Sequence, residues 1–197
     1  MQTEIEAKWL NIDKAALRKA LLGVGAELVS PERLMIRRAY DFPDERLESV
    51  KGWVRVRNED NKITLSYKQL DDRTIHGTKE VTVVVNDFDS TCSFLESIGL
   101  MQKSVQETKR ESWKLGNSEI ELDTWPWIPS FVEIESTSEA ELKTAAELLG
   151  LDYSKALHGS VETAYKAVYD VTEEEVNGWK EIRFVAVPTW LSSKKIN

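Results

Sequence analysis

Charged and apolar residues alternate in several short stretches of the chain. Residues 4–9 read EIEAKW, and in a strand the charged residues Glu4, Glu6 and Lys8 share one face while the apolar residues share the other. The same alternation occurs in WVRVR at 53–57, KITLSYK at 62–68, TKEVT at 78–82, EIELD at 119–123 and FVEIE at 131–135. The pattern predicts strands with one polar face and one apolar face.

Three segments have helical character and separate these strands. They span residues 13–24, 90–98 and 139–149, and a glycine suited to a C-terminal cap follows each one. The order of one strand, helix, several strands, helix, several strands and helix gives about eight short strands, which favour antiparallel pairing. We therefore expect an α+β protein in which helices cover the apolar face of the sheet.

Two architectures satisfy this alternation. In the first, an open sheet turns its charged face to water; in the second, eight strands close into a β-barrel with the charges inside and the helices packed outside. Whole strands carry charges of one sign, such as Arg55 and Arg57 or Glu133 and Glu135, although like charges repel when they lie side by side. This clustering favours a barrel whose interior holds a ligand.

Composition limits the functional classes. The 197 residues fit one main domain at 1–170, followed by a C-terminal helix or tail at 171–197, and the sequence indicates no oligomeric state. The net charge of −8 disfavours nonspecific binding to nucleic acid or to an anionic membrane. No apolar run is long enough to cross a membrane, so we expect a cytoplasmic protein.

Several common chemistries find no support in the residues. Cys92 is the single cysteine and is expected to be structural, while His76 and His158 lie apart with no partner at zinc-ligand spacing. The chain also lacks a Gly-rich phosphate loop followed by Gly-Lys-Ser or Gly-Lys-Thr.

The charged faces instead suit a divalent cation and a polyanion. Carboxylates on neighbouring strands can surround a hard cation such as Mg²⁺ or Mn²⁺, and arginines grip phosphate oxygens in pairs. The candidate metal ligands are Glu4, Glu6, Asp123, Glu133 and Glu135. The candidate cationic wall is Lys8, Arg55, Arg57, Lys68 and Arg110.

With these residues in place, EIEAK resembles the Glu-x-Glu-x-Lys signature of the CYTH family, the triphosphate tunnel metalloenzymes. AYDFPD, WVRVR, LSYK and FVEIE follow in the family's order, and the resemblance covers roughly residues 2–168. It implies an eight-stranded antiparallel barrel with a charged tunnel. It also implies catalytic roles for Glu4, Glu6 and Lys8, and triphosphate contacts from Lys8, Arg55, Arg57, Lys68, Arg110 and Glu80.

The chain departs from the family pattern at several positions. Thr78 and Thr82 stand where charged residues are usual, Lys79 has to face away from the tunnel, and Thr108 replaces a lysine. Trp125 and Trp127 either stack on an organic group at the tunnel mouth or pack down against the barrel. The sequence does not decide whether Arg37 or Arg38 points inward.

Three functions remain open at this stage. The resemblance favours metal-dependent hydrolysis of a small-molecule triphosphate, such as tripolyphosphate, thiamine triphosphate or a nucleoside triphosphate. A class IV-type adenylyl cyclase, which converts ATP to cyclic AMP and pyrophosphate, is the first alternative. A binding module that holds triphosphate or polyphosphate without turnover is the second.

Overall fold

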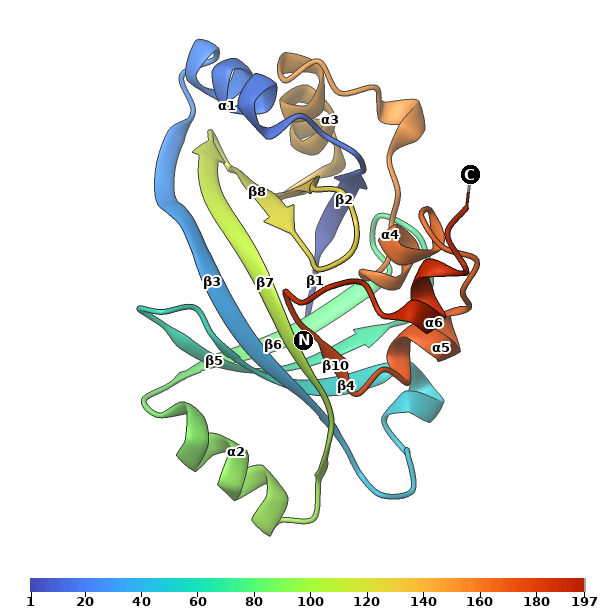
Figure 1. The fold of residues 1–197 in the computed structure, drawn as a ribbon. Helices are drawn as coiled ribbons and strands as arrows, with labels where there is room; N and C mark the ends of the chain where they lie inside the picture. The colour runs from blue at the N-terminus through green and yellow to red at the C-terminus, as the bar shows by residue number, and fades with distance from the viewer. Residues whose placement is uncertain (197) are drawn as a thin grey trace.

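A strongly curled, mainly antiparallel sheet forms the centre of the protein in the computed structural model, which describes residues 1–196 (Figure 1). Its strands are β1 (Gln2–Thr3), β2 (Ile5–Trp9), β3 (Glu27–Asp41), β4 (Gly52–Asn58), β5 (Ile63–Leu70), β6 (Thr78–Val85), β7 (Met101–Leu115), β8 (Ser118–Thr124), β9 (Phe131–Ser136) and β10 (Glu181–Ile182). The α-helices are α1 (Lys14–Gly23), α2 (Phe88–Ser97), α3 (Glu139–Leu148), α4 (Glu162–Lys166), α5 (Glu173–Asn177) and α6 (Thr189–Ser192). Two 3₁₀ turns, η1 (Glu48–Val50) and η2 (Tyr153–Lys155), complete the elements.

The N-terminal segment joins the two ends of the sheet. The strand order is β1-β6-β5-β4-β3-β7-β8-β9-β2, so β1 pairs with β6 at one end and β2 pairs with β9 at the other. Glu4 lies between these two short strands, and its backbone N–H donates to the carbonyl of Thr78 on β6. The predicted antiparallel barrel is therefore confirmed as a curled sheet of eight main strands, in which β1 and β2 form one interrupted strand and the short parallel β10 is additional.

Strands β3 and β7 are the longest in the sheet, at 15 residues each. They pair along most of their length, and the register shifts between Leu28 and Arg33 and again after Ala39. Such irregularities let a long strand bend and twist, and Pro31 falls inside the one between Ser30 and Arg33. The three helices appear where predicted, with Asp13, Asp87 and Ser138 as N-caps. None of the helices within residues 1–196 combines the length and apolar character needed to cross a membrane.

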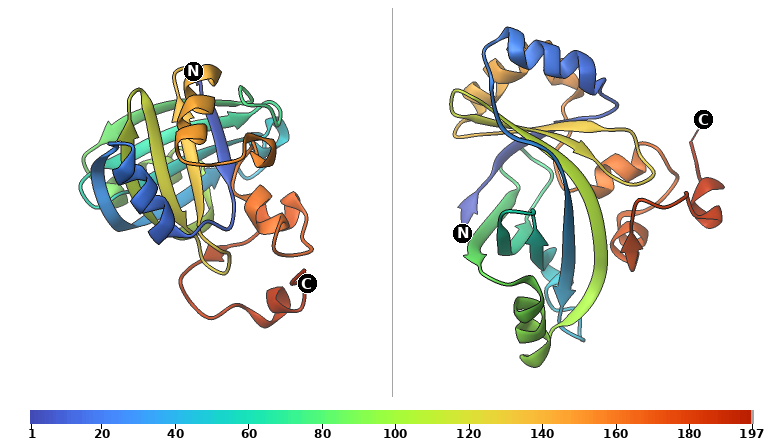
Figure 2. Two further views of the ribbon diagram at one scale, coloured as in Figure 1. Left: turned by 90° about the horizontal axis from the view of Figure 1, so that it is seen from above. Right: turned by 60° about the vertical axis from the view of Figure 1, so that its left-hand side comes forward.

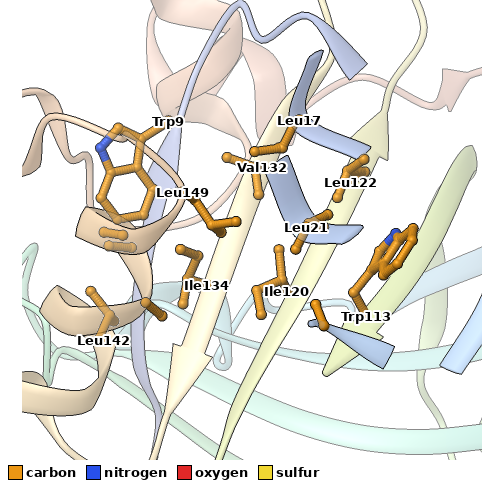
Figure 3. Packing of buried hydrophobic residues seen from close by; sticks show 14 residues of the cluster. Trp9, Leu17, Leu21, Trp113, Ile120, Leu122, Val132, Ile134, Leu142 and Leu149 are labelled. Atoms are coloured by element: carbon orange, nitrogen blue, oxygen red, sulfur yellow. The ribbon is translucent and has the colours of Figure 1, made fainter. Parts of the chain in front are cut away.

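Two apolar clusters fill the space between the outside of the sheet and its helices. Helices α1 and α3 cover β2, β8 and β9, where Trp9, Ile120 and Ile134 meet Leu21 and other helix residues (Figure 3). On another part of the sheet, α2 brings Cys92 and Leu95 against residues of β3 and β4, so the cysteine is part of this core. Figure 2 shows α1 and α2 at opposite ends of the sheet.

The segment 171–196 packs onto the sheet domain through a third apolar cluster. The cluster joins Ile182 and Leu191 to Trp125, Phe131 and Tyr165, all of which are almost fully buried. β10 adds to β7 in parallel, and the backbone N–H of Val105 donates to the carbonyl of Lys180. The segment is thus fixed to the domain by both side chains and backbone.

We predict that this segment contributes to the stability of the whole domain. Ile134 lies under α3 and Ile182 lies in the C-terminal cluster, and both are no more than 1% exposed. Replacing either with alanine should lower the free energy of unfolding by about 2–4 kcal/mol, measured in urea. An Ile182→Ala variant whose main unfolding transition matches that of the parent would show that 171–196 is an independent appendage.

Candidate functional site

The inner side of the sheet encloses a cavity of about 570 Å³ that is lined mainly by charged side chains. Glu4, Glu6 and Lys8 point into it and are less than a tenth exposed, while Ala7 and Trp9 from the same strand belong to the outer apolar core. The charged faces of the strands therefore point inward, as the barrel hypothesis predicted. Every residue predicted for the site lines this cavity: Glu4, Glu6, Lys8, Arg55, Arg57, Lys68, Glu80, Arg110, Asp123, Glu133 and Glu135.

The order of the strands separates the two signs of charge. β5, β4, β3 and β7 are neighbours and supply Lys68, Arg55, Arg57, Arg37 and Arg110. β8, β9 and β2 are also neighbours and supply Glu121, Asp123, Glu133, Glu135 and Glu6. The cavity thus has a mainly basic wall and a mainly acidic wall, with Lys8 as a cation within the acidic wall and with Glu59 and Glu80 as carboxylates beside the basic wall.

Lysines neutralise part of the negative charge in the cavity. Lys8 Nζ lies 3.4 Å from a carboxylate oxygen of Glu6 and 3.4 Å from one of Glu133. Burial by itself lowers the pKa of Lys8, but these two carboxylates outweigh burial and hold its pKa above the usual range. Lys68 Nζ donates to Glu4 Oε2 at 2.8 Å and lies 3.1 Å from Glu80.

Arginines of the basic wall face carboxylates in the same way. Arg110 donates from Nε to Asp123 Oδ1 at 2.7 Å and from Nη2 to the other oxygen. Arg55 Nη2 donates to Glu80 Oε1 at 3.1 Å. Most of the buried charge is therefore balanced within the cavity.

The acidic side chains nevertheless exceed what these cations neutralise. Burial, followed by a hydrogen bond with Glu80, raises the pKa of Glu4 from 4.5 to about 8 despite the nearby Lys68. Burial and the neighbouring charge of Glu133 raise the pKa of Glu135 to about 7, and burial raises that of Glu121 to about 7. Near neutral pH, each of these three carboxyl groups is therefore protonated in part of the molecules and ionised in the rest.

The carboxylate oxygens of this cavity are the kind of ligand that a hard divalent cation prefers. Within residues 1–196, no three Asp, Glu, His or Cys side chains lie close enough together to form a preassembled metal site. The carboxylates turn toward Lys8, Lys68 and Arg110 instead, as the ion pairs above show. Crowded carboxylates that retain protons are nonetheless the groups that gain most from a cation, since it can take the place of those protons.

The cavity also contains charged residues that the sequence did not assign to the site. Arg37 lines the cavity and is 7% exposed, whereas Arg38 points outward to Asp89 and the ring of Phe88. Adjacent arginines show no alternation, so their facing depends on the register of β3 with its neighbours. The sequence gives a clearer signal for Glu121, because it shares a strand face with Asp123 in EIELD.

Two of the threonines that depart from the family pattern form hydrogen bonds with charged residues of the cavity. Thr78 Oγ1 donates to Glu6 Oε1 at 3.1 Å, and Thr108 accepts from Arg37 Nη2 at 2.9 Å. Lys79 points outward and pairs with Asp71, as predicted. The threonines therefore hold charged neighbours in place rather than leaving gaps.

Trp125 and Trp127 pack against the C-terminal cluster. Trp125 is 4% exposed and meets the edge of Tyr165, with the Arg37 guanidinium 4.7 Å from the centre of its ring. Trp127 packs edge-on against Trp179. Both rings therefore pack against the protein rather than standing free at the mouth of the cavity, although Trp125 also lines the cavity.

Comparisons with known proteins agree with this architecture. A model of a protein family, described as the CYTH domain, matches residues 2–165. No curated protein matches the chain significantly.

Solved structures share the fold at low sequence identity. A candidate adenylate cyclase from Vibrio parahaemolyticus has a TM-score of 0.73 and 17% identity, and the match covers 84% of this chain and 98% of that one. The PH1012 protein from Pyrococcus horikoshii has a TM-score of 0.65 and 21% identity, covering 78% and 93%. A candidate adenylyl cyclase from Hippeastrum, described as revealing a dominant triphosphatase activity, has a TM-score of 0.57 and 15% identity, covering 88% and 94%. At these identities the likeness shows the fold alone.

We predict that the metal-free protein loses stability as the pH rises from about 5 to 8. The raised pKa values of Glu4, Glu121 and Glu135 mean that the folded state binds more protons than the unfolded chain across this range. Stability therefore falls as these groups ionise inside the cavity. Melting temperatures in EDTA should decline across the range, and Mg²⁺ should restore more stability at pH 8 than at pH 6. A metal-free melting temperature that rises from pH 5 to pH 8 would show that the carboxyl groups of the cavity do not have raised pKa values in the folded state.

Proposed function

The chain belongs to the CYTH domain family, and from this premise we propose that it is a divalent-metal-dependent triphosphatase that hydrolyses a small-molecule triphosphate inside its cavity. Members of this family are triphosphatases or adenylyl cyclases, so an enzymatic role is the general expectation. Tripolyphosphate, thiamine triphosphate and nucleoside triphosphates all carry the part of the ligand that the cavity suits.

The observation that carries this proposal is the separation of charge between the two walls. A triphosphate needs cations along its length, and its reacting phosphorus needs charge neutralisation and a positioned nucleophile. Arg55, Arg57, Lys68 and Arg110 offer the first from neighbouring strands. The acidic wall opposite offers oxygen ligands for the cations that commonly accompany polyphosphates.

Each wall has a distinct role in this proposal. The basic wall binds and orients the phosphate groups, and Lys8 reaches the same space from the acidic side. The residues that would hold the metal are Glu4, Glu6, Asp123, Glu133 and Glu135. Mg²⁺ or Mn²⁺ bound there would supply charge neutralisation and an electrophilic centre at the phosphoryl oxygens.

Ligand and metal should bind together because the ion pairs across the cavity must exchange partners. Lys68 and Arg110 are held by Glu4 and Asp123. Phosphate oxygens that replace these carboxylates would release them to bind a divalent cation, and the cation in turn would release the basic side chains. The enzyme residues thus favour the metal–polyphosphate complex over either component alone.

Adenylyl cyclase activity remains the second candidate. Cyclisation requires the ribose 3′-oxygen to be held in line with the α-phosphorus, which calls for contacts with the sugar and base. Trp127 is engaged with Trp179, but Trp53 on β4 is partly exposed and lines the cavity, so it could provide a stacking surface for an aromatic group. Hydrolysis is less demanding because it requires only an ordered water, and it is therefore the activity we favour. A binding module without turnover is the third possibility, and the retained carboxylates argue against it.

We expect orthophosphate as the product when the purified protein is incubated with tripolyphosphate and Mg²⁺ or Mn²⁺. A parallel incubation with ATP, resolved by chromatography, distinguishes the candidates. Cyclic AMP with pyrophosphate would replace the proposal with the cyclase. Tight binding with no product from either compound would leave the binding module.

We also predict that Glu135→Gln weakens metal activation without weakening the fold. Glu135 lines the cavity, has no ion-pair partner among residues 1–196, and keeps a raised pKa beside Glu133. The Mg²⁺ concentration for half-maximal activity should rise about tenfold or more, while the metal-free melting temperature stays equal or rises.

Glu147→Gln is the matched control, because Glu147 is exposed on α3 outside the sheet. It should change neither measurement. If the Glu135→Gln variant titrates with Mg²⁺ like the parent, Glu135 is not a metal ligand.

A further inference from the structure

Arg37 differs from the other arginines that line the cavity. Arg55, Arg57 and Arg110 each lie within ion-pair distance of a carboxylate, on Glu80, Glu59 and Asp123 respectively. Arg37 has no carboxylate within 4.0 Å in the part of the chain that the structure describes. A buried guanidinium without a counter-ion is unusual, because desolvation strongly disfavours its charge.

The surroundings of Arg37 hold its orientation without neutralising its charge. Its Nη2 donates to Thr108 Oγ1 at 2.9 Å, and its guanidinium carbon lies 4.7 Å from the centre of the Trp125 ring. Its Nε is buried and has no hydrogen-bond partner. A hydroxyl oxygen and an aromatic face thus position the group, while part of its donor set remains unused.

Neighbouring charges make this position still less favourable. Burial, and then repulsion from Arg55, Arg57 and Arg110, holds the pKa of Arg37 well below its usual range, although the more distant charge of Asp123 acts in the opposite direction. The hydrogen bond to Thr108 and the contact with Trp125 fix the side chain but place no carboxylate within ion-pair distance of it. An anion that enters the cavity would offset this cost.

We propose that Arg37 is a substrate-binding residue whose guanidinium is reserved for phosphate oxygens of the polyphosphate in the cavity. The proposal extends the function proposed above by adding a binding residue, and it depends on that function only for the choice of ligand. The other cavity arginines must first release carboxylates, whereas Arg37 is available at once. It therefore contributes more to affinity than an arginine that exchanges one anion for another.

The proposal predicts that removing the Arg37 guanidinium leaves the stability of the protein equal or higher but lowers its affinity for tripolyphosphate. Arg37→Met removes an unpaired buried charge, so the melting temperature in EDTA should equal or exceed that of the parent. The same variant should bind tripolyphosphate about tenfold more weakly or worse, measured by isothermal titration calorimetry in EDTA so that turnover does not interfere. A merely structural arginine would give the reverse, with a lower melting temperature and unchanged affinity.

Arg38→Met is the matched control. Arg38 is the next residue on the same strand but faces outward toward Asp89, which is largely exposed. Its substitution should leave the affinity for tripolyphosphate unchanged. Arg37→Lys adds a second test, since it keeps the charge without the planar guanidinium and should fall between the parent and Arg37→Met.

The outcomes separate this proposal from the proposed function. An Arg37→Met variant that binds tripolyphosphate as tightly as the parent overturns the role of Arg37 and leaves the triphosphatase proposal standing. A parent protein that binds tripolyphosphate but does not hydrolyse it overturns the triphosphatase proposal, while the role of Arg37 is still judged by binding. A parent protein that does not bind tripolyphosphate at millimolar concentration, with or without Mg²⁺, overturns both.

Discussion

The burial of many charges of both signs inside one curled sheet is the constraint on which the rest of this structure depends. Isolated charges cannot be buried at acceptable cost, so each must meet an opposite charge, a proton or a ligand. Lys8 between Glu6 and Glu133 and Arg110 against Asp123 show the first solution, and the raised pKa of Glu135 shows the second. The strands, their order and their outer helices serve to hold these groups facing one another.

Much of the site could be predicted from the sequence because successive side chains along a strand point to opposite faces of the sheet. In EIEAK and FVEIE the period of two assigns every side chain to the inside or the outside once one residue is placed. The same argument fails for Arg37 and Arg38, since adjacent residues of one type carry no such period. It also fails for the long strands β3 and β7, whose irregular registers depend on pairing that a local pattern does not encode. The third apolar cluster was missed because its residues are scattered between Trp125 and Leu191.

Thr78 and Thr108 show how a site can change while its shape is kept. Each stands where a charged residue was expected, and each hydrogen-bonds a charged neighbour from another strand, Glu6 and Arg37 respectively. For Thr108 this neighbour is itself a cation, so the positive charge on this part of the wall comes from β3 rather than β7. Position-by-position comparison of one strand therefore underestimates the charge of the cavity, because it does not see replacements across the sheet.

The interrupted N-terminal strand links the assembly of the site to the synthesis of the chain. Residues 2–9 are synthesised well before β9, yet Glu6 pairs in register with Glu135 and Lys8 with Glu133 on that strand. Contacts so distant in sequence form late and slow the folding of a domain. During this delay, the alternating charges of EIEAKW keep the early strand hydrated and discourage pairing with other nascent chains. The residues proposed for ligand binding thus keep one face of this strand polar until the strand pairs.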